Sequence, residues 1–295
     1  MRETRYYDVA GHVFSVDAAD SHFTQMANYE PFGCEGGDTL FALTIADGEA
    51  PLFTEEIRQD DEDQMIVCGY TADGRSVFEF CWHGVTAGWL VCAADYREGQ
   101  LLTTGCQTTL AIDNALMVLY ALAPADRQTL LFHSSVVNCR GRAYMFLGKS
   151  GTGKSTHSRL WLRHIEATEL INDDNPVVRI QMPAEKCGGA AVITVYGSPW
   201  SGKTPCYRQV SCPLGGIVLL SQAPYNKICR MGGIEAYAAL VPSISGKRWD
   251  TRIADGLHQS ENILAQQVPV FHLACLPDEE AARMCCAALT NEEVS

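Results

Sequence analysis

The residues with the clearest chemical meaning form a glycine-rich segment in the middle of the chain, GKSGTGKS at positions 148–155. The segment matches the pattern G-x-x-x-x-G-K-[ST] in full, and it stands between an apolar run and an amphipathic helical pattern. Glycines let successive backbone N–H groups turn toward phosphate oxygens, and the positive end of the following helix points at the same place. The segment therefore predicts a site for the phosphates of a nucleotide. A glycine turn with a chance Lys-Ser pair is the structural alternative.

Each polar residue of this segment has an expected partner. Lys154 should contact the β- and γ-phosphates, and the hydroxyl of Ser155 should bind Mg²⁺. Lys149 either adds charge beside the phosphates or faces solvent. The residues expected to bind the nucleotide and its metal ion are Gly148, Lys149, Ser150, Gly151, Thr152, Gly153, Lys154, Ser155 and Thr156.

A second requirement of such a site is a carboxylate that holds the metal ion. The sequence ELINDD at 169–174 has the pattern of a short buried strand that ends in two acids, Asp173 and Asp174, and a second strand follows at 176–180. Adjacent side chains near a strand end point in different directions, so one acid could reach the metal and the other a substrate hydroxyl. The alternative is a turn with two solvated aspartates.

A third segment, YGSPWSGKT at 196–204, combines turn residues with a hydroxyl and a cation. Gly197 and Gly202 permit a tight loop, in which Ser201 and Lys203 could bind an anion or the transferring phosphate. A structural turn packed by Trp200 is the competing interpretation. Three further cations are expected to be solvated at the surface, namely Arg208, Lys247 and Arg248.

The apolar pattern indicates the elements that surround these residues. Residues 6–104 hold short alternating or apolar runs between turn residues, which predicts a β-rich region with a hairpin turn at 72–75. The acidic stretch 55–63 within it is expected to be a solvated loop rather than a cation site. A helix is expected over about 108–122, capped by Thr108 or Thr109. It leads into a hairpin with strands at 130–138 and 143–148, directly before the phosphate segment.

The remainder of the chain mixes the two kinds of pattern. Strand-like runs are AVITVYG, LGGIVLL and VPVFHLAC, and helical runs are STHSRLWLRHI, IEAYAALVPSI and DEEAARMCCAAL. We therefore expect an α/β protein with mixed sheets. Its domains should be a β-rich N-terminal region over 1–105 and a nucleotide-binding domain over 106–295.

Composition limits the classes of function. The chain has 22 Lys and Arg against 35 Asp and Glu, a net charge of −13, which disfavours binding to nucleic acid or to an anionic membrane. No apolar segment reaches the ~20 residues that cross a bilayer, and no secretion signal is evident, so a cytoplasmic protein is expected. The 13 cysteines are odd in number and lack C-x-x-C spacing, which favours reduced thiols in the core over disulfides or a zinc site.

Around the phosphate segment the chain resembles the C-terminal domain of HPr kinase/phosphorylase, which has the phosphoenolpyruvate carboxykinase-like P-loop fold. The resemblance covers about 129–180 and is carried by His133 on the first hairpin strand, GKSGTGKS, and INDDNPVV at 171–178. It implies that the γ-phosphoryl group of ATP passes to a serine hydroxyl with the help of Mg²⁺. It also implies Asp173 as the base and Asp174 as a metal ligand beside Ser155, two roles that are open to exchange. His133 would hydrogen-bond an acid or a phosphate.

The chain departs from that family in two places. The family carries a Glu-containing stretch after its aspartates, where this chain has YGSPWSGKT, a form that resembles relatives of unassigned or peptide-modifying type. The N-terminal third has no evident likeness to the family's N-terminal domain. The resemblance therefore leaves the phosphoryl acceptor open, and it implies assembly into a homo-oligomer.

These observations lead to one expected function and two alternatives. We expect an ATP- and Mg²⁺-dependent kinase that acts on a hydroxyl of a protein, peptide or small molecule, with Asp173, Asp174, His133 and Lys203 as catalytic residues. One alternative is a nucleotide-binding regulatory protein without catalysis. The other is a carboxykinase-like reaction on a small carboxylic acid, which would need several clustered arginines, of which the motif regions offer few.

Overall fold

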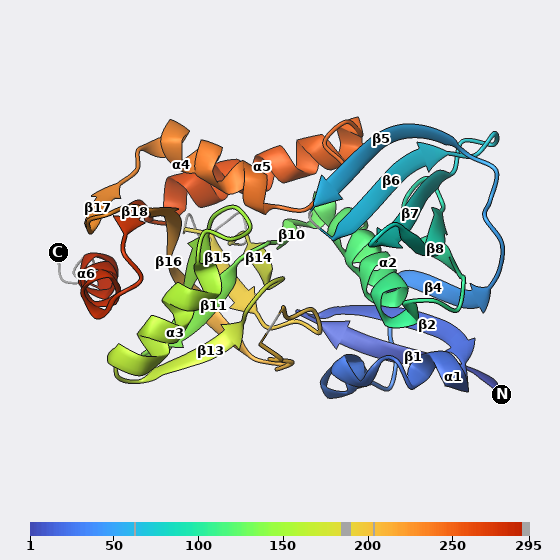
Figure 1. Ribbon diagram of the computed structural model, residues 1–295, viewed down its shortest axis with the longest axis horizontal. Helices are drawn as coiled ribbons and strands as arrows, with labels where there is room; N and C mark the ends of the chain where they lie inside the picture. The colour runs from blue at the N-terminus through green and yellow to red at the C-terminus, as the bar shows by residue number, and fades with distance from the viewer. Residues whose placement is uncertain (62, 184–189, 203, 291–295) are drawn as a thin grey trace. The chain divides into compact units, whose positions relative to one another are not determined.

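The computed structural model of the chain describes residues 1–61, 63–183, 190–202 and 204–290 (Figure 1). The chain forms two compact units, Met1–Pro124 and Ala125–Ser295. Each unit is built on a nine-stranded sheet that combines parallel and antiparallel pairs. The expected mixed α/β class is therefore confirmed at this level.

The first unit is the β-rich region that the alternating pattern predicts. Its strand order is β3-β1-β2-β4-β9-β8-β7-β6-β5, and the pairs β2–β4 and β4–β9 are parallel. The strands are β1 (Arg2–Val9), β2 (His12–Ala19), β3 (Gly33–Cys34), β4 (Thr39–Asp47), β5 (Thr54–Asp61), β6 (Gln64–Tyr70), β7 (Ser76–Trp82), β8 (Val85–Cys92) and β9 (Glu98–Thr103). The short helices α1 (Asp20–Phe23) and η1 (Ala27–Phe32) lie between β2 and β3 along the chain.

Two sequence expectations for this sheet have different outcomes. The turn between β6 and β7 forms the expected hairpin, with Gly74 at a φ of +82°. The acidic stretch expected to be a loop is instead the edge strand β5, which pairs with β6. An edge strand can keep acidic side chains in water, and residues 54–60 are exposed, with Arg58 paired to Glu55. The acids at 55, 56 and 60 are therefore solvated as expected, but on a strand, and Glu62 lies outside the described residues.

The helix α2 (Thr108–Leu122) packs its apolar face on the first sheet. Ile112, Leu116 and Leu119 are fully buried, and a methyl group at Gly99 would stand 2.9 Å from the Leu119 side chain. The sequence-based division after residue 105 assigned this helix to the nucleotide-binding domain. Its packing assigns it to the first unit, so the division between the units follows Pro124.

The start of α2 differs from the expected threonine cap. The N-cap residue is Gln107, which has a left-handed φ of +51° and no side-chain capping hydrogen bond. Thr109 donates its hydroxyl to the side-chain oxygen of Gln25 instead, at 2.8 Å. The expected cap is therefore wrong, because a tertiary partner takes the hydroxyl that would have served the helix end.

The second unit carries the phosphate segment on a branched sheet. Its strand order is β10-β14-β15-β16-β12-β11-β13. Strand β18 pairs with the C-terminal part of β16, residues 217–222, and β17 pairs with β18. Only β12, β16 and β18 run parallel to a neighbour among the described strands of this unit. The strands are β10 (Thr129–Leu131), β11 (Ser135–Cys139), β12 (Arg142–Leu147), β13 (Thr168–Asn172), β14 (Val177–Gln181), β15 (Val192–Tyr196), β16 (Ser211–Gln222), β17 (Lys227–Arg230) and β18 (Val270–Cys275).

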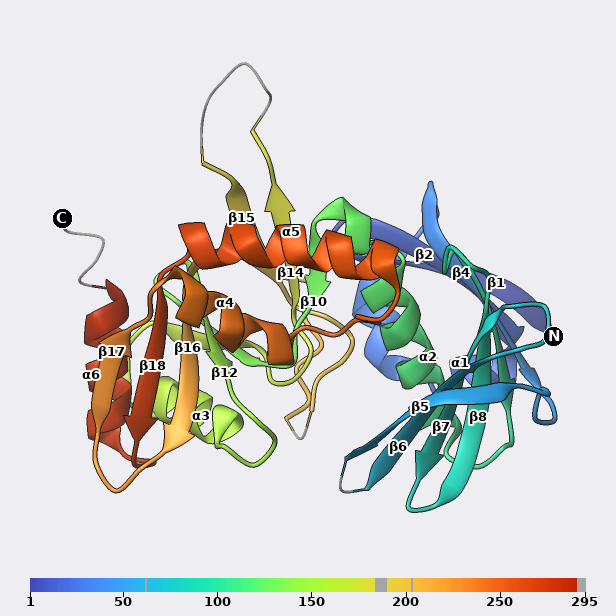
Figure 2. The same cartoon turned by 90° about the horizontal axis from the view of Figure 1, so that it is seen from above.

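Helices lie on both faces of this sheet, as Figures 1 and 2 show. On one face Trp161 of α3 and Leu289 of α6 join Phe146 and Val218 of the sheet in one fully buried cluster. Ile253 and Leu257 of α5 are buried on the other face, and Asp250 caps that helix. The helices are η2 (Ala125–Arg127), α3 (Lys154–His164), α4 (Gly233–Leu240), η3 (Val241–Ser243), α5 (Thr251–Gln267) and α6 (Glu279–Thr290).

Two further observations hold for the described residues of both units. The cysteines in the described ranges are all free thiols. Within the same ranges, no helix combines the length and the apolar character that a membrane span requires.

Candidate functional site

The glycine-rich segment forms a loop between the end of the buried strand β12 and the start of α3. Gly151 and Gly153 have φ values of +76° and +107°, in the left-handed region that favours glycine. Thr152 closes the turn by donating its N–H and its hydroxyl to the carbonyl oxygen of Lys149, at 3.1 and 2.6 Å. The strand, loop and helix that a phosphate site requires are therefore all present. Of the two alternatives for Lys149, the structure shows its side chain exposed.

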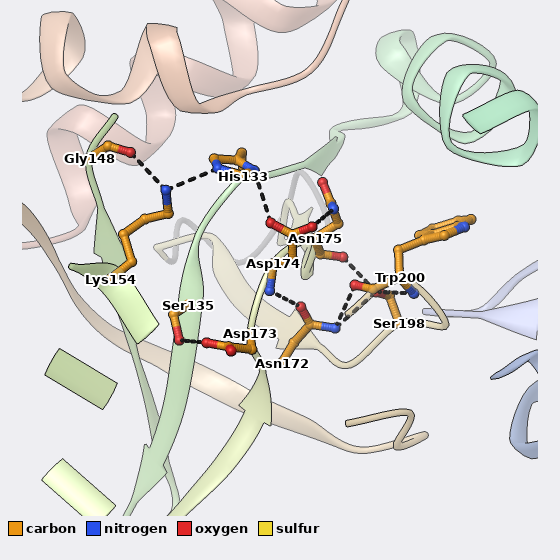
Figure 3. Close-up of polar contacts among 10 residues, drawn as sticks. All are labelled: His133, Ser135, Gly148, Lys154, Asn172, Asp173, Asp174, Asn175, Ser198 and Trp200. Carbon is orange, nitrogen blue, oxygen red and sulfur yellow. Dashed lines mark hydrogen bonds and ion pairs between the residues drawn. The ribbon is translucent and has the colours of Figure 1, made fainter. Parts of the chain in front are cut away.

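One chain of contacts joins this loop to the acid pair, and Figure 3 shows it. The Lys154 side chain is largely buried; its Nζ donates to the carbonyl oxygen of Gly148 at 3.0 Å and lies 3.0 Å from Nε2 of His133. Nδ1 of His133 lies 3.1 Å from Oδ1 of Asp174. An ammonium group can only donate, so Nε2 accepts and Nδ1 carries the hydrogen that is donated to the carboxylate. The imidazole therefore bridges the lysine and the acid.

His133 reaches this position from a link between two strands. The sequence predicted it on the first strand of the hairpin, whereas β10 ends at Leu131 and β11 begins at Ser135. Its N–H donates to the carbonyl oxygen of Ser243 at 2.7 Å, so a neighbouring segment has replaced the regular strand ladder. The hairpin of β11 and β12 is itself confirmed. His133 is therefore an exposed residue at the sheet edge, with side-chain exposure of 47%, rather than a core histidine.

The two acids that follow β13 point in different directions, as expected. Asp173 is buried, and its Oδ1 accepts a hydrogen bond from the hydroxyl of Ser135 at 2.8 Å. Ser135 in turn lies 2.5 Å from the hydroxyl of Ser158 on α3. Because Ser135 gives its hydrogen to Asp173, Ser158 donates to Ser135. Asp174 is the more accessible acid, with 32% of its side chain exposed. Asp173 is therefore fixed to the phosphate-loop helix, and Asp174 faces His133.

Two asparagines around the acids fix the position of Asp174. The side-chain oxygen of Asn172 accepts the N–H of Asp174 at 2.8 Å, and its amide group donates to the carbonyl oxygen of Trp200 at 3.1 Å. The amide of Asn175 donates to Oδ2 of Asp174 at 2.8 Å. Both asparagines are buried. The sequence N-D-D-N thus supplies the acids and their supports from one short turn (Figure 3).

The segment 196–202 is a structural turn beside Asp174. Trp200 is buried, and the hydroxyl of Ser198 donates to the carbonyl oxygen of Asn175 at 2.6 Å. Ser201 donates its hydroxyl to the carbonyl oxygen of Thr204 at 2.7 Å, a contact within the turn. A methyl group at Gly202 would stand 3.2 Å from Cβ of Asp174. The turn packed by Trp200 is thus the better interpretation, while the predicted catalytic residue Lys203 lies outside the described residues.

The three cations expected at the surface are all engaged with other groups. Arg208 is exposed and pairs with Glu169 at 3.1 Å. Arg248 pairs at 2.6 Å with Glu261, which is fully buried, and Lys247 is itself only 3% exposed. The expectation of surface solvation is therefore wrong for Lys247, which is buried. Arg248 keeps 34% of its side chain exposed and is partly solvated while it pairs with Glu261.

The donor set of the site fits a magnesium ion that is shared with phosphates. The hydroxyl of Ser155 and the two carboxylates are hard oxygen donors, and Mg²⁺ commonly takes one or two carboxylates together with substrate phosphates. Oδ2 of Asp173 is buried and has no hydrogen-bond partner among the described residues, so its lone pairs are available to a cation or a water molecule. Within the described ranges no group of three or more His, Cys, Asp and Glu side chains could hold a metal ion, at this site or at any other, so Ser155 and substrate phosphates would have to complete the set of ligands.

Some residues of the site carry no signal in the sequence. Ser135 and Ser158 are ordinary serines in apolar or helical patterns, and Gln222 ends a long strand 71 residues beyond the loop. Gln222 donates its side-chain amide to the carbonyl oxygen of Gly151 at 3.1 Å. These contacts follow from strand pairing between distant parts of the chain. The only local hint was that Ser158 lies one helical turn after Ser155, on the phosphate-loop helix.

Comparisons with known proteins find remote similarity to solved structures only. No family model and no curated protein matches the sequence. A similar solved structure is the HPr(Ser) kinase/phosphatase from Coxiella burnetii, which is 10% identical, covers 56% of this chain and 90% of its own, and gives a TM-score of 0.32. The relationship is a distant one, so function has to be inferred from the geometry of the site.

Proposed function

We propose that this protein is an ATP- and Mg²⁺-dependent kinase that transfers the γ-phosphoryl group to a hydroxyl acceptor. The observation that carries the proposal is the chain of contacts from Lys154 through His133 to Asp174. The Lys154 ammonium and the accessible Asp174 carboxylate thus lie on opposite sides of the His133 imidazole. Phosphoryl transfer needs these two groups close together, because one binds the phosphates and the other receives the proton of the acceptor.

The phosphate side of the proposal rests on groups that are already oriented. The loop amides and the N-terminus of α3 supply donors and a positive dipole. Lys154 is held by the carbonyl oxygen of Gly148 and by His133. When a triphosphate binds, its β- and γ-oxygens would replace these partners, which costs little because the lysine is already in place.

The acids receive separate roles from their different exposure. Asp174 can be reached by an acceptor hydroxyl, and Asp173 cannot, because it is buried and clamped by Ser135. We therefore assign the base to Asp174 and the metal side of the site to Asp173 with Ser155, which exchanges the order implied by the family resemblance. Bound Mg²⁺ would neutralise charge that develops on the β- and γ-phosphates.

The proposed transfer moves one proton to Asp174 and exchanges one P–O bond for another. The acceptor hydroxyl gives its proton to the Asp174 carboxylate, and its oxygen forms a bond to the γ-phosphorus. The bond between that phosphorus and the β,γ-bridging oxygen breaks, and ADP leaves. His133 donates to Asp174 through Nδ1 and so fixes the orientation of the carboxylate.

The test is transfer of label from γ-labelled ATP to serine peptides, small alcohols and water. We expect transfer to at least one hydroxyl acceptor. The Asp174→Asn variant should bind ATP as tightly as the wild type and transfer at least about a hundredfold more slowly, because a general base is lost. Tight ATP binding without transfer to any acceptor would favour a regulatory nucleotide-binding protein and contradict the kinase.

A further inference from the structure

The carboxyl ends of three neighbouring parallel strands meet beside the phosphate loop. Strand β12 pairs in parallel with β16, and β16 with β18, so that the ends at Leu147, Gln222 and Cys275 lie along one edge of the sheet (Figure 2). Ligands of open α/β sheets bind at such an edge. The phosphate loop follows β12, which leaves the connections after β16 and β18 as the surfaces next to it.

The strand order gives a bound nucleotide a direction. His133 precedes β11 and the two acids follow β13, and these strands lie on one side of β12 in the order β13-β11-β12-β16. Lys154, which should contact the β- and γ-phosphates, turns toward His133. The γ-phosphate thus lies on the β11 side of the loop, so the nucleoside has to leave the loop on the other side, toward β16 and β18.

The turn after β16 is attached to the phosphate loop and presents an aromatic ring. Gln222 binds the carbonyl oxygen of Gly151, and three residues later the side chain of Tyr225 is 56% exposed. Leu276, the first residue after β18, is also exposed, at 39%, and its N–H donates to the side-chain oxygen of Asn226 at 2.8 Å. The turn with the exposed Tyr225 is thus bound, through Asn226, to the segment with the exposed Leu276 at the edge where the nucleoside is expected.

This turn is held rigidly in place. The N–H of Ala223 donates to the carbonyl oxygen of Cys275 at 3.1 Å, and the side-chain amide of Asn226 donates to Asp278 at 3.1 Å. Asp278 also caps the start of α6 by accepting the N–H of Ala281 at 2.9 Å. A single exposed aromatic residue is ordinary on a protein surface. An aromatic residue on a turn that is fixed beside a phosphate loop is suited to stack on a base, because the turn does not have to be ordered on binding.

We propose that the turn 222–226, together with Leu276, binds the nucleoside of the triphosphate, with the ring of Tyr225 stacking on the base. The proposal rests on the proposed nucleotide-binding function and adds the side of the loop and the residue that recognise the base. Stacking area favours a purine over a pyrimidine, so the ligand class is a purine nucleoside triphosphate. Gln222 acts as a positioning residue that holds the loop against the turn.

The experiment measures calorimetric dissociation constants of the full chain for ATP, CTP and inorganic tripolyphosphate, each with Mg²⁺. Wild type is compared with Tyr225→Ala and with the matched control Tyr225→Phe, which keeps the ring. Loss of one stacked base weakens binding about five- to a hundredfold. We expect that loss for ATP in Tyr225→Ala, a smaller loss for CTP, and no change for tripolyphosphate. Tyr225→Phe should bind ATP like the wild type.

Other outcomes separate the inference from the function on which it rests. If wild type binds ATP and Tyr225→Ala binds it equally tightly, the base is recognised elsewhere and the inference is overturned while the nucleotide site stands. If Tyr225→Ala weakens tripolyphosphate as much as ATP, Tyr225 acts through the loop and the inference also falls. If the wild type binds neither ATP nor tripolyphosphate, the proposed function itself is wrong.

Discussion

At the scale of single residues, the position of Asp174 depends on Gly202, which has no side chain to press against the acid. Asp174 is bound by Asn175 and His133 on its carboxylate, and Gly202 packs against its Cβ. These contacts leave the carboxylate one orientation. Gly202 was expected from the sequence only to permit a tight loop, and the structure adds its close packing on Asp174.

The Gly202→Ala variant tests this packing. Its new methyl group would stand 3.2 Å from Cβ and 3.4 Å from Cγ of Asp174, so the acid has to shift by a few tenths of an ångström. We expect phosphoryl transfer to fall about tenfold, since catalysis is sensitive to small misplacement, while ATP affinity stays unchanged. The control Gly233→Ala adds a methyl group where no other atom lies within 4 Å. Undiminished transfer in Gly202→Ala would argue against Asp174 as the base.

Single residues were predictable where their chemistry is local. The phosphate segment and the paired acids could be found because a loop of backbone amides and a strand-end carboxylate are written in consecutive residues. The different environments of Asp173 and Asp174 could not, because they depend on Ser135 and Ser158, which reach Asp173 only after β11, β13 and α3 have packed together.

At the scale of elements, α3 is joined to the acid pair by a buried pair of hydroxyls. Ser158 is 1% exposed and donates to Ser135, which donates to Asp173. Any displacement of α3 by a bound nucleotide would therefore also shift the Asp173 carboxylate through these two hydrogen bonds. The helix that points its dipole at the phosphates also positions the carboxylate that we assign to the metal.

Removing the hydroxyl of Ser158 should uncouple the two elements. The Ser158→Ala variant leaves Ser135 without its donor, and we expect phosphoryl transfer to fall about tenfold and to need more Mg²⁺, with ATP affinity little changed. The matched control is Ser260→Ala on α5, which removes an equally buried serine that donates to Gly256 far along the chain from the acids. If both variants lose the same activity, the effect is one of general stability.

The helix of the first unit carries an acid whose environment opposes ionisation. Burial raises the pKa of Asp113 to about 6, although hydrogen bonds from Tyr29 and Asn28 act in the opposite direction. A carboxyl pKa that is higher in the folded state means that the folded state binds the proton more tightly. Stability is therefore lost as the pH rises from about 4 through 6, and the loss is complete above that range.

The Asp113→Asn variant should remove this pH dependence. Between pH 4.5 and 7.5 the ionisation costs the wild type about 2 kcal/mol of unfolding free energy, from the shift in pKa. We expect the variant to be more stable than wild type at pH 7.5 and closer to it at pH 4.5 in urea denaturation. A variant that is less stable at pH 7.5 would show that the ionised carboxylate contributes to folding.

Elements were predictable where one face is strongly apolar and less so where polar residues dominate. The apolar strands β4, β6, β7, β8, β12, β16 and β18 and the helices α2, α3, α4 and α6 follow their predicted patterns, whereas the acidic strand β5 and the helix α5 were missed. The α5 sequence, TRIADGLHQSENILAQQ, is polar overall, and the buried positions of this helix include Gly256 and Glu261. A more useful signal was the N-cap Asp250 followed by Ile253 and Leu257 at helical spacing.

At the scale of the whole molecule, the chain is two units, and the residues of the candidate site all belong to the second. Phosphate loop, acids, His133 and the turn with Tyr225 lie between Ala125 and Thr290. The β-rich character of the first unit could be predicted from its alternation. The boundary between the units could not be predicted, because the unit to which α2 belongs is set by the sheet on which it packs and not by its own sequence.

The proposal that a triphosphate binds at the loop 148–155 is tested most directly by the affinity of the full chain for Mg²⁺·ATP. This affinity is compared among the wild type, Lys154→Ala and the control Lys149→Ala. The control removes the same charge from an exposed position of the same loop. Binding should be clear in wild type, weaker by about ten- to a hundredfold in Lys154→Ala, where charge-assisted bonds to phosphate are lost, and little changed in Lys149→Ala. A wild type that does not bind, or a Lys154→Ala variant that binds as tightly, would contradict a triphosphate site at this loop.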